Sequence, residues 1–414
     1  MSGQGPDGPS GDVGRSHDGA AGRHAIEDVL NSTALLAAVG RMRPDREPSE
    51  LLARVVWNTL AEPGDGTAGA IVSALGPEEA LHVAFGDGGG AWQGAERPAA
   101  RVLAEARRRW VSRLDPGRVE DAMDRAFRCG ARLLAPGDAV WPVRLDDLQE
   151  SAPHVLWVRG SDEALGRTGV AIVGARAASA YGEHVAAEFA GDLAGDGLVV
   201  VSGGAYGIDG AAHRAALGVD GETVAVLAGG VDRAYPAGHS QLFGRIVENG
   251  AVISELPCGA APTRWRFLAR NRVIGALAAA TVVVEAGWRS GSLNTAGHAA
   301  ALGRPLGAVP GPVTSSTSAG CHRLLREYDA QCVTTAAEVR ELLGPSVSLP
   351  PGALEADPDL IGLRDALSGR AFRDVQELAR RSGLSRERVE ALLGMLELDG
   401  GAVRGDGGWR GVRG

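Results

Sequence analysis

The sequence predicts an α/β protein with a Rossmann-like, doubly wound parallel sheet, preceded by an all-helical domain and followed by a winged-helix-like domain. Three observations predict this fold class. Short β-branched apolar runs alternate with Ala-rich helical segments in the middle of the chain. Only helical periodicity precedes them, and a helix–helix–turn–helix pattern follows them. Continuous apolar runs are typical of parallel strands that are buried on both faces of a sheet.

The first part of the chain divides into a tail and a helical region. Residues 1–24 are rich in Gly, Ser and Asp, and we expect them to be disordered because they can bury little apolar surface. Residues 25–134 are expected to form a small helical (SAM-like) domain, since no strand pattern interrupts them. The apolar residues at helical spacing are Leu51, Val55, Val56 and Leu60, and then Val102, Ala106 and Trp110.

The central region, residues 135–343, is predicted to be the Rossmann-like domain. Each apolar run there ends in a turn or polar residue and is followed by a helical pattern, which indicates repeated βα units. Because the carboxyl ends of parallel strands meet at one edge of the sheet, the loops after these runs should lie together. The expected strands are 170–173, 198–201, 223–227, 251–254, 281–284 and 306–309.

The C-terminal part begins with a Pro-, Ser- and Gly-rich stretch, residues 344–357, which we interpret as a linker. Residues 358–414 then contain three short helical patterns and a Gly-rich end, which together predict a winged-helix-like domain. Gly383 lies in the expected turn, Ser385 is an expected N-cap, and Val403 and Trp409 lie in the expected hairpin. A small helical tail for protein contacts is the alternative interpretation.

Composition excludes several classes of chemistry. All 42 basic residues are arginine, so neither a Schiff-base lysine nor a Walker-type phosphate loop is possible. The four cysteines form no CxxC pair, and we expect no metal, cofactor or disulfide scaffold. The sequence contains no signal peptide or membrane span, which predicts a cytoplasmic protein. With a net charge of −9, binding of nucleic acid would require a local basic patch.

Two glycine-containing turns follow expected strands. In the first, Gly174 and Arg176 precede a helix beginning near Ser179, an arrangement that suits an anion, although such turns are common in α/β proteins. The second contains the predicted phosphate-binding residues Ser202, Gly203 and Gly204. Beyond it, one helix carries the pair Asp209 and His213, either an acid–base pair or a helix cap with a packed histidine.

Two further segments contain arginines suited to DNA. The segment 263–272 contains four arginines, Trp265 and Phe267, a composition that suits gripping phosphates while stacking bases. A solvated helix face is the alternative. The loop after the strand at 281–284 offers Arg289, Ser290, Gly291 and Ser292, and Glu285 could orient Arg289. Together the segments predict a continuous anion groove at one edge of the sheet.

The ordered segments GARAASAYG, SGGAYGIDGAAH, FLARNRVIGAL and VVVEAGWRSGSLNTAGHA resemble the DNA-processing protein A (DprA/Smf) family over residues 135–340. The resemblance implies dimers that bind single-stranded DNA cooperatively, protect incoming DNA in natural transformation and load the RecA recombinase. It implies that the turn of Gly174 and Arg176 holds a phosphate. It also implies a set of DNA contacts: Arg264, Phe267, Arg270, Asn271 and Arg272.

The chain departs from the family pattern at Ala175, where the family has a hydroxyl residue, and at His239 and His322, where it usually has Asn. The main alternative function is that of the related phosphoribohydrolases. Their PGGxGTxxE motif is absent, because the corresponding loop reads GWRSGSLNTAG. A nucleotide sensor of the same superfamily is a second alternative. We therefore expect a single-stranded DNA-binding homodimer with no catalytic residues.

Overall fold

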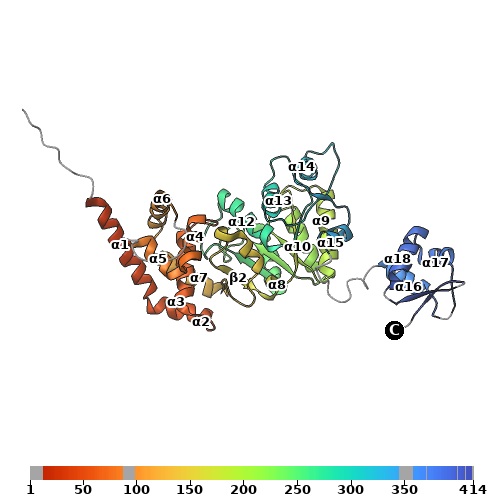
Figure 1. Ribbon diagram of the computed structural model, residues 1–414, viewed down its shortest axis with the longest axis horizontal. Helices are drawn as coiled ribbons and strands as arrows, with labels where there is room; N and C mark the ends of the chain where they lie inside the picture. The colour runs from red at the N-terminus through yellow and green to blue at the C-terminus, as the bar shows by residue number, and fades with distance from the viewer. Residues whose placement is uncertain are drawn as a thin grey trace, which may run out of the picture. The chain divides into compact units, whose positions relative to one another are not determined.

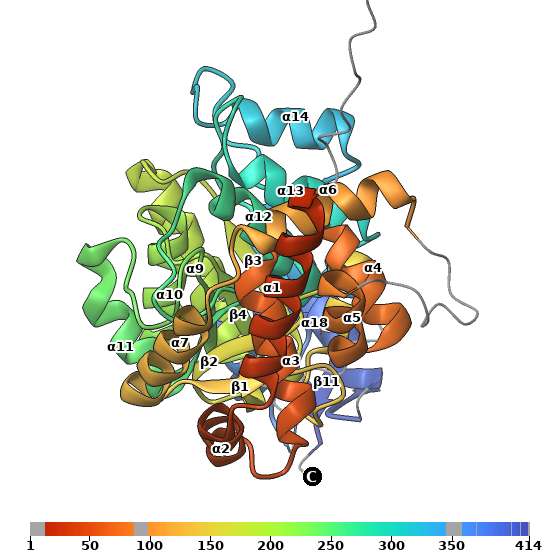
Figure 2. The ribbon, with the colours of Figure 1, turned by 90° about the vertical axis from the view of Figure 1, so that its left-hand side faces the viewer.

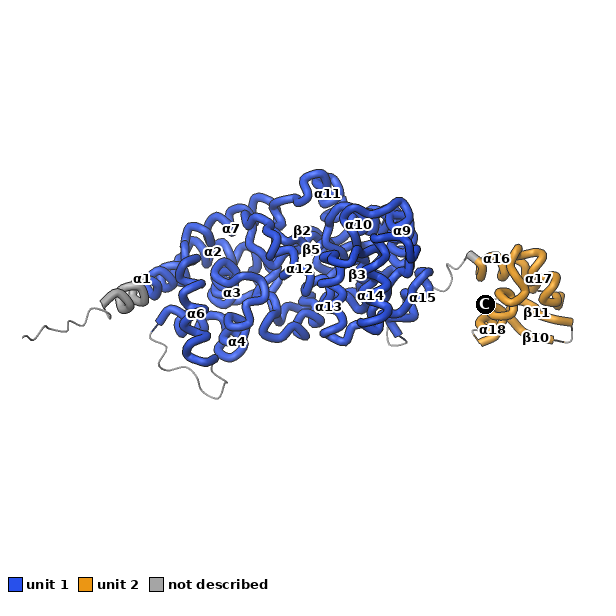
Figure 3. The backbone as a smooth tube through the Cα atoms, turned by 90° about the horizontal axis from the view of Figure 1, so that it is seen from above, with its two compact units in different colours: residues 1–347 blue, residues 348–414 orange. Residues whose placement is uncertain are grey.

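The computed structural model describes residues 13–86, 98–344, 358–369, 371–398, 400–405 and 407–412, without the side chains of residues 13–21 and of Pro358. The chain forms two compact units, Met1–Val347 and Ser348–Gly414 (Figure 3). Except for Gly344, the predicted linker lies outside the described residues, as do the first twelve residues of the predicted tail. Within the described ranges, no helix has the length and apolar character needed to cross a membrane.

The first unit begins with a bundle of helices that gathers beside strands β1 and β2 (Figures 1 and 2). The edge-on packing of Trp57 against Trp110, with ring centroids 5.0 Å apart, lies in its core. Ala106 and Trp110 are fully buried as expected, but Val102 is 46% exposed and Leu103 is buried in its place. The helices are α1(Val13–Leu30), α2(Thr33–Met42), α3(Pro48–Leu60), α4(Gly66–Leu75), α5(Pro77–Phe85), α6(Ala100–Val111) and α7(Pro116–Cys129).

Helix α1 corrects one sequence expectation. It begins at Val13, so residues 13–24, which we expected to be disordered, form its first turns. The segment is rich in Ala and Gly with almost no large apolar side chains, and composition alone therefore indicated that it buries too little to order. Ile26 and Val29, further along the helix, are nearly fully buried and anchor it to the bundle core.

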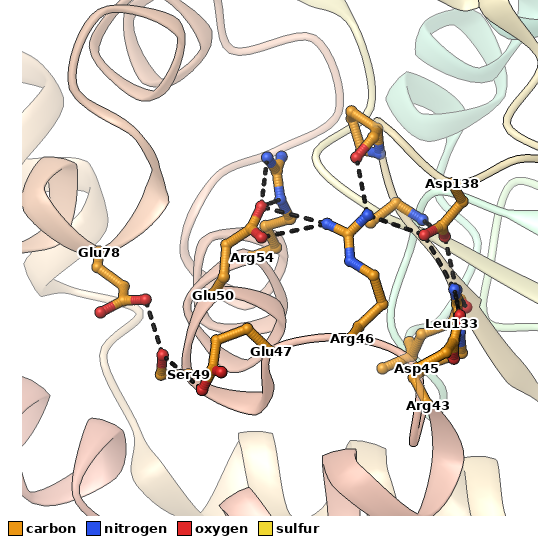
Figure 4. Close-up of polar contacts among 12 residues, drawn as sticks. Arg43, Asp45, Arg46, Glu47, Ser49, Glu50, Arg54, Glu78, Leu133 and Asp138 are labelled. Carbon is orange, nitrogen blue, oxygen red and sulfur yellow. Dashed lines mark hydrogen bonds and ion pairs between the residues drawn. The ribbon is translucent and has the colours of Figure 1, made fainter.

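Charged contacts join the helical bundle to the edge of the sheet (Figure 4). Both terminal nitrogens of the Arg43 guanidinium donate to the Asp138 carboxylate, Nη1 at 2.5 Å and Nη2 at 2.9 Å. Nη1 also donates to the carbonyl of Leu133 at 2.7 Å. Arg46 donates to the same carboxylate at 2.9 Å. The Asp138 side chain is only 2% exposed, so two arginines compensate one buried charge. The bundle is thereby held against the strand that Leu133 belongs to.

The sheet has nine strands in the order β1-β2-β6-β5-β4-β3-β7-β8-β9. Strands β3 to β9 are parallel, as predicted, but β1 pairs antiparallel with β2, and β2 antiparallel with β6. The strands are β1(Arg132–Leu134), β2(Leu156–Gly160), β3(Gly169–Val173), β4(Val199–Ser202), β5(Thr223–Val226), β6(Gly250–Ser254), β7(Ala280–Val283), β8(Leu306–Ala308) and β9(Gln331–Cys332).

Helices cover both faces of this sheet. Along β5, Val224 and Val226 pack in one hydrophobic core, which also contains residues of α12(Arg264–Leu277) and α13(Ser292–Ala301). Ala225, between them, points to the opposite face and packs in a second core, which contains residues of α11(Ser240–Asn249). The chain order reverses direction between β3 and β7, so the doubly wound class is confirmed. The helices are η1(Val143–Ser151), α8(Glu163–Gly166), α9(Ala180–Gly195), α10(Ile208–Gly218), η2(Ala237–His239), α11(Ser240–Asn249), α12(Arg264–Leu277), α13(Ser292–Ala301), α14(Ala319–Glu327) and α15(Ala336–Leu342).

The second unit is a winged-helix-like fold, as predicted. Gly383 ends the second helix in the left-handed conformation, with φ of +76°, and the Ser385 hydroxyl accepts from the backbone N–H of Arg388 at 3.2 Å. A two-stranded hairpin follows, in which Arg404 pairs with Trp409. The elements are α16(Pro358–Ala366), α17(Val375–Ser382), α18(Arg386–Leu398), β10(Ala402–Gly405) and β11(Gly408–Gly411).

Candidate nucleic-acid interface

A groove of about 560 Å³ opens at the carboxyl edge of the sheet, in the crevice where the strand order reverses. Loops after β3, β4, β5 and β7 and the start of α12 contribute to it. The groove brings together most of the residues predicted from the sequence. These are Gly174, Arg176, Arg264, Phe267, Arg270, Asn271, Ser290, Gly291 and Ser292. The predicted residues Ser202, Gly203, Gly204, Arg272 and Arg289 do not line it.

The turn that carries Arg176 is fixed by a buried carboxylate. Glu285 accepts from the backbone N–H of Ser179 at 2.9 Å, from the Ser179 hydroxyl at 2.6 Å and from the Thr317 hydroxyl at 3.1 Å. Ser179 also caps α9. We expected Glu285 to orient Arg289, and this was wrong, because its carboxylate is committed to Ser179 and Thr317. The exposed guanidinium of Arg176 is left facing the groove.

The glycine turn after β4 has a structural role. The Ser202 hydroxyl is fully buried and donates to the carbonyl of Ile172 at 2.6 Å, so it is not positioned to donate to a phosphate as expected. A Cβ at Gly203 would lie 2.3 Å from the Arg270 guanidinium, and Gly204 has a φ of +68°. These glycines make room for a protein side chain, whereas the sequence suggested that they admit a ligand.

Neither interpretation of Asp209 and His213 holds in full, because the two side chains bond to different partners and Asp209 makes no capping hydrogen bond to α10. The Asp209 carboxylate accepts from the backbone N–H groups of Gly203 and Ala205 at 3.2 and 3.3 Å, and burial raises its pKa. His213 is fully buried and bonds the Thr223 hydroxyl at 2.7 Å, and burial lowers its pKa to about 3. The histidine is therefore neutral at physiological pH. The Asp209 carboxylate holds the loop after β4 through the N–H groups of Gly203 and Ala205.

Arg270 is the cation at the base of the groove. Its Nη1 donates to the carbonyl of Gly203 at 2.8 Å and to the carbonyl of Val226, while its buried Nε has no hydrogen-bond partner among the described residues. Burial lowers its pKa to about 10, so the side chain stays charged at neutral pH. Arg270 therefore places a positive charge in the lining of the groove, which favours an anionic ligand.

Phe267 contacts two of the three arginines that line the groove. The Arg176 guanidinium carbon is 4.5 Å from the centre of the Phe267 ring, and that of Arg270 is 5.9 Å away. Tyr235 also contacts this ring, with centroids 5.5 Å apart, and is 49% exposed. The sequence analysis did not select Tyr235. Its position after β5, at the same edge as the other loops, was the signal that could have identified it.

The remaining residues of the basic segment have other partners. Arg272 is buried and makes two hydrogen bonds of 2.6 and 2.5 Å to the Glu255 carboxylate, so it cannot contact DNA as expected. Asn271 donates to the carbonyl of Gly291 at 3.2 Å and to the Asn294 side chain at 3.3 Å, which ties α12 to the loop after β7 and the start of α13. That loop presents Ser290 and Ser292 to the groove, whereas Arg289 is exposed outside its lining.

The family departures lie around this site. His239 is buried, and its Nδ1 lies 3.0 Å from the carbonyl oxygen of Gly204. Its ring packs edge-on against that of Tyr206, with centroids 4.7 Å apart, so His239 supports the glycine turn. His322 is half-buried, with Nε2 3.4 Å from the carbonyl of Gly311. Ala175 leaves the turn between Gly174 and Arg176 without a hydroxyl donor. None of the three lines the groove.

The fold and the groove define a Rossmann-like protein whose groove, lined by arginine and aromatic side chains, lies at the switch point of its sheet. The family model described as DNA recombination-mediator protein A matches residues 132–344, and the DprA winged helix domain matches residues 347–408. The chain belongs to this family of DNA-processing proteins, as the sequence motifs indicated.

Relatives support this assignment over most of the chain. A putative DNA processing protein DprA of Mycobacterium tuberculosis is 45% identical over 378 residues, covering 86% of this chain and 92% of that protein. The protein Smf of Escherichia coli is 37% identical over 271 residues, covering 62% of this chain and 71% of that protein. The X-ray structure of DNA processing protein A from Streptococcus pneumoniae matches with a TM-score of 0.55 at 29% identity, covering 70% of this chain and 95% of that chain.

Proposed function

We propose that this protein binds single-stranded DNA in the groove between the loops after β3 and β7 and the start of α12. The observation that carries the proposal is the stack of Arg176 on Phe267, 4.5 Å away, beside the buried cation Arg270. Arginines that grip phosphates next to an aromatic ring that can stack a base are the usual elements of single-strand binding. Bases inside a duplex already stack on each other, and their faces are not available to Phe267.

The protein's role is to receive DNA and pass it to the recombinase. We propose that it acts in the bacterial cytoplasm, protects incoming single strands during natural transformation or recombination, and loads RecA onto them as a homodimer. Membership of the DNA recombination-mediator family supports this role. The groove supports the DNA-binding half of it, since Arg176, Arg264 and Arg270 concentrate positive charge on a chain whose net charge is −9.

A competition experiment tests the proposal. A labelled oligothymidylate bound to the protein is challenged with unlabelled single strand, blunt duplex and mononucleotide. We expect the single strand to compete best. If three to four phosphates are neutralised, the logarithm of the affinity should fall with the logarithm of salt concentration at a slope of roughly −2 to −3. Equal competition by duplex would contradict the proposal, and stronger competition by mononucleotide would favour a nucleotide sensor.

We also propose that the protein has no catalytic turnover. Asp209 is held by two backbone N–H groups, His213 is buried, and Glu285 is held by Ser179 and Thr317, so each of the residues suited to acid–base chemistry has a structural task. Incubation with AMP, ATP and labelled single-stranded DNA, with and without magnesium, should release no product. Product release that a Glu285→Gln substitution removes would favour the phosphoribohydrolase-like alternative.

A further inference from the structure

A second groove, of about 350 Å³, lies next to the first and is not explained by it. The helical bundle forms one wall of this second groove, through the end of α3 and the region around α6 and α7. The loop after β6 and the start of α12 form the other wall. Its lining residues are Asn58, Thr59, Ala61, Glu62, Arg113, Arg118, Asp121, Leu256, Pro257, Cys258, Gly259, Ala260 and Arg266.

The first turn of α12 separates the two grooves. Arg264 lines the first groove and Arg266 lines the second, with Trp265 between them. Successive side chains on an α-helix point about 100° apart, so Trp265 projects between the directions of the two arginines. Its side chain is 63% exposed, so the indole ring is accessible to a base. The arrangement places an aromatic platform on the ridge between two arginine-containing grooves.

Three arginines and two carboxylates line the second groove, so its net charge is positive. These residues are Arg113, Arg118, Arg266, Glu62 and Asp121. Glu62 lies 3.2 Å from Arg113 and 2.9 Å from Arg266. Arg118 contacts Asp115 at 3.5 Å, but both side chains are more than half exposed, and such pairs contribute little free energy. Arg118 can therefore exchange Asp115 for a phosphate at small cost.

We propose that the single-stranded DNA site continues from the first groove across Trp265 into the second groove, so that the helical bundle forms part of the DNA-binding surface. Trp265 stacks one base on the ridge, and Arg118, Arg113 and Arg266 receive the backbone beyond it. This inference rests on the proposed function, because it extends the same DNA track. It gives the N-terminal helices a direct role in binding.

Binding of short and long oligothymidylates tests the extension. Oligomers of about 4 and about 15 nucleotides bracket the range of single-strand site sizes. Trp265→Ala should weaken binding of the long oligomer about tenfold, because one stacked base is lost. Arg118→Ala should weaken it about threefold and make the salt slope about 0.7 less steep. Both variants should bind the short oligomer, which fits in the first groove, within about twofold of the unaltered protein.

Two variants of the same bundle serve as controls. Arg101→Ala removes an equal charge from α6, where the side chain is 90% exposed and paired with Glu105, and Phe127→Ala removes an aromatic side chain that is 69% exposed on α7. Neither residue lines a groove, so both variants should bind like the unaltered protein. Unchanged binding of the long oligomer by Trp265→Ala and Arg118→Ala would overturn the extension, as would equal losses on both lengths. If the unaltered protein binds neither oligomer, the proposed function itself fails.

Discussion

Replacing Arg272 with alanine is expected to lower the free energy of unfolding of the first unit by about 3–5 kcal/mol. The guanidinium makes two hydrogen bonds to the Glu255 carboxylate, and its Nε donates to the carbonyl of Ser151 at 3.0 Å. The side chains of Arg272 and Glu255 are 6% and 10% exposed. Removing one partner leaves a buried carboxylate uncompensated, and that desolvation cost is the main source of the loss.

Denaturant unfolding followed by the signal of the first unit measures this effect. Arg101→Ala is the matched control, because it breaks an ion pair with Glu105 between exposed side chains on a single helix and should cost less than about 1 kcal/mol. An Arg272→Ala protein that unfolds like the unaltered chain but no longer binds DNA would contradict the structural role. That result would restore the original sequence interpretation of Arg272 as a DNA contact.

Replacing Arg176 with alanine is expected to weaken single-strand binding about 10- to 100-fold, the effect of losing a charge-assisted phosphate contact of about 1.5–3 kcal/mol. The side chain is exposed and contacts the Phe267 ring, and it is not within ion-pair distance of any carboxylate that the structure describes. The melting temperature should therefore change little. Weaker binding without a loss of thermal stability distinguishes Arg176 from Arg270. Replacing Arg270 would also remove its hydrogen bonds to the carbonyls of Gly203 and Val226.

Fluorescence anisotropy with a labelled oligothymidylate measures the loss for Arg176→Ala. Arg245→Ala removes the same charge from the exposed surface of α11, outside both grooves, and should bind like the unaltered protein. Equal weakening in both variants would mean that net charge alone drives binding. Unchanged binding by Arg176→Ala would place the DNA elsewhere on the molecule.

The central fold was predictable because parallel strands buried on both faces must be continuously apolar. The runs that became β3 to β8 had that character. The antiparallel edge was missed because β1 is only the three residues Arg132–Leu134, too short to show a period. Helix α1 was missed for a different reason. Its first turns contain almost no large apolar side chains, and the residues that it buries in the bundle core, Ile26 and Val29, lie further along.

The segments that form the site were predicted from the sequence. Which of their side chains face the groove could be decided only from the geometry of the helix. Arg270 and Arg272 are two residues apart on α12, so they point about 200° from each other, and only Arg270 can face the groove. Ser202 was misassigned because it ends a fully buried strand, where its hydroxyl must bond to the protein. Glycine spacing could not distinguish room for a ligand from room for the Arg270 side chain.

Photocrosslinking tests the central claim most directly, because it reports where the DNA lies. A single-stranded oligomer carrying iodouracil is bound to the full chain, irradiated, and the adducts are located by mass spectrometry. Iodouracil reacts with aromatic side chains in van der Waals contact. We predict adducts at Phe267 or Tyr235, which face each other in the first groove. Adducts confined to Phe372 and Trp409 of the winged-helix unit, with none in the groove, would contradict the account.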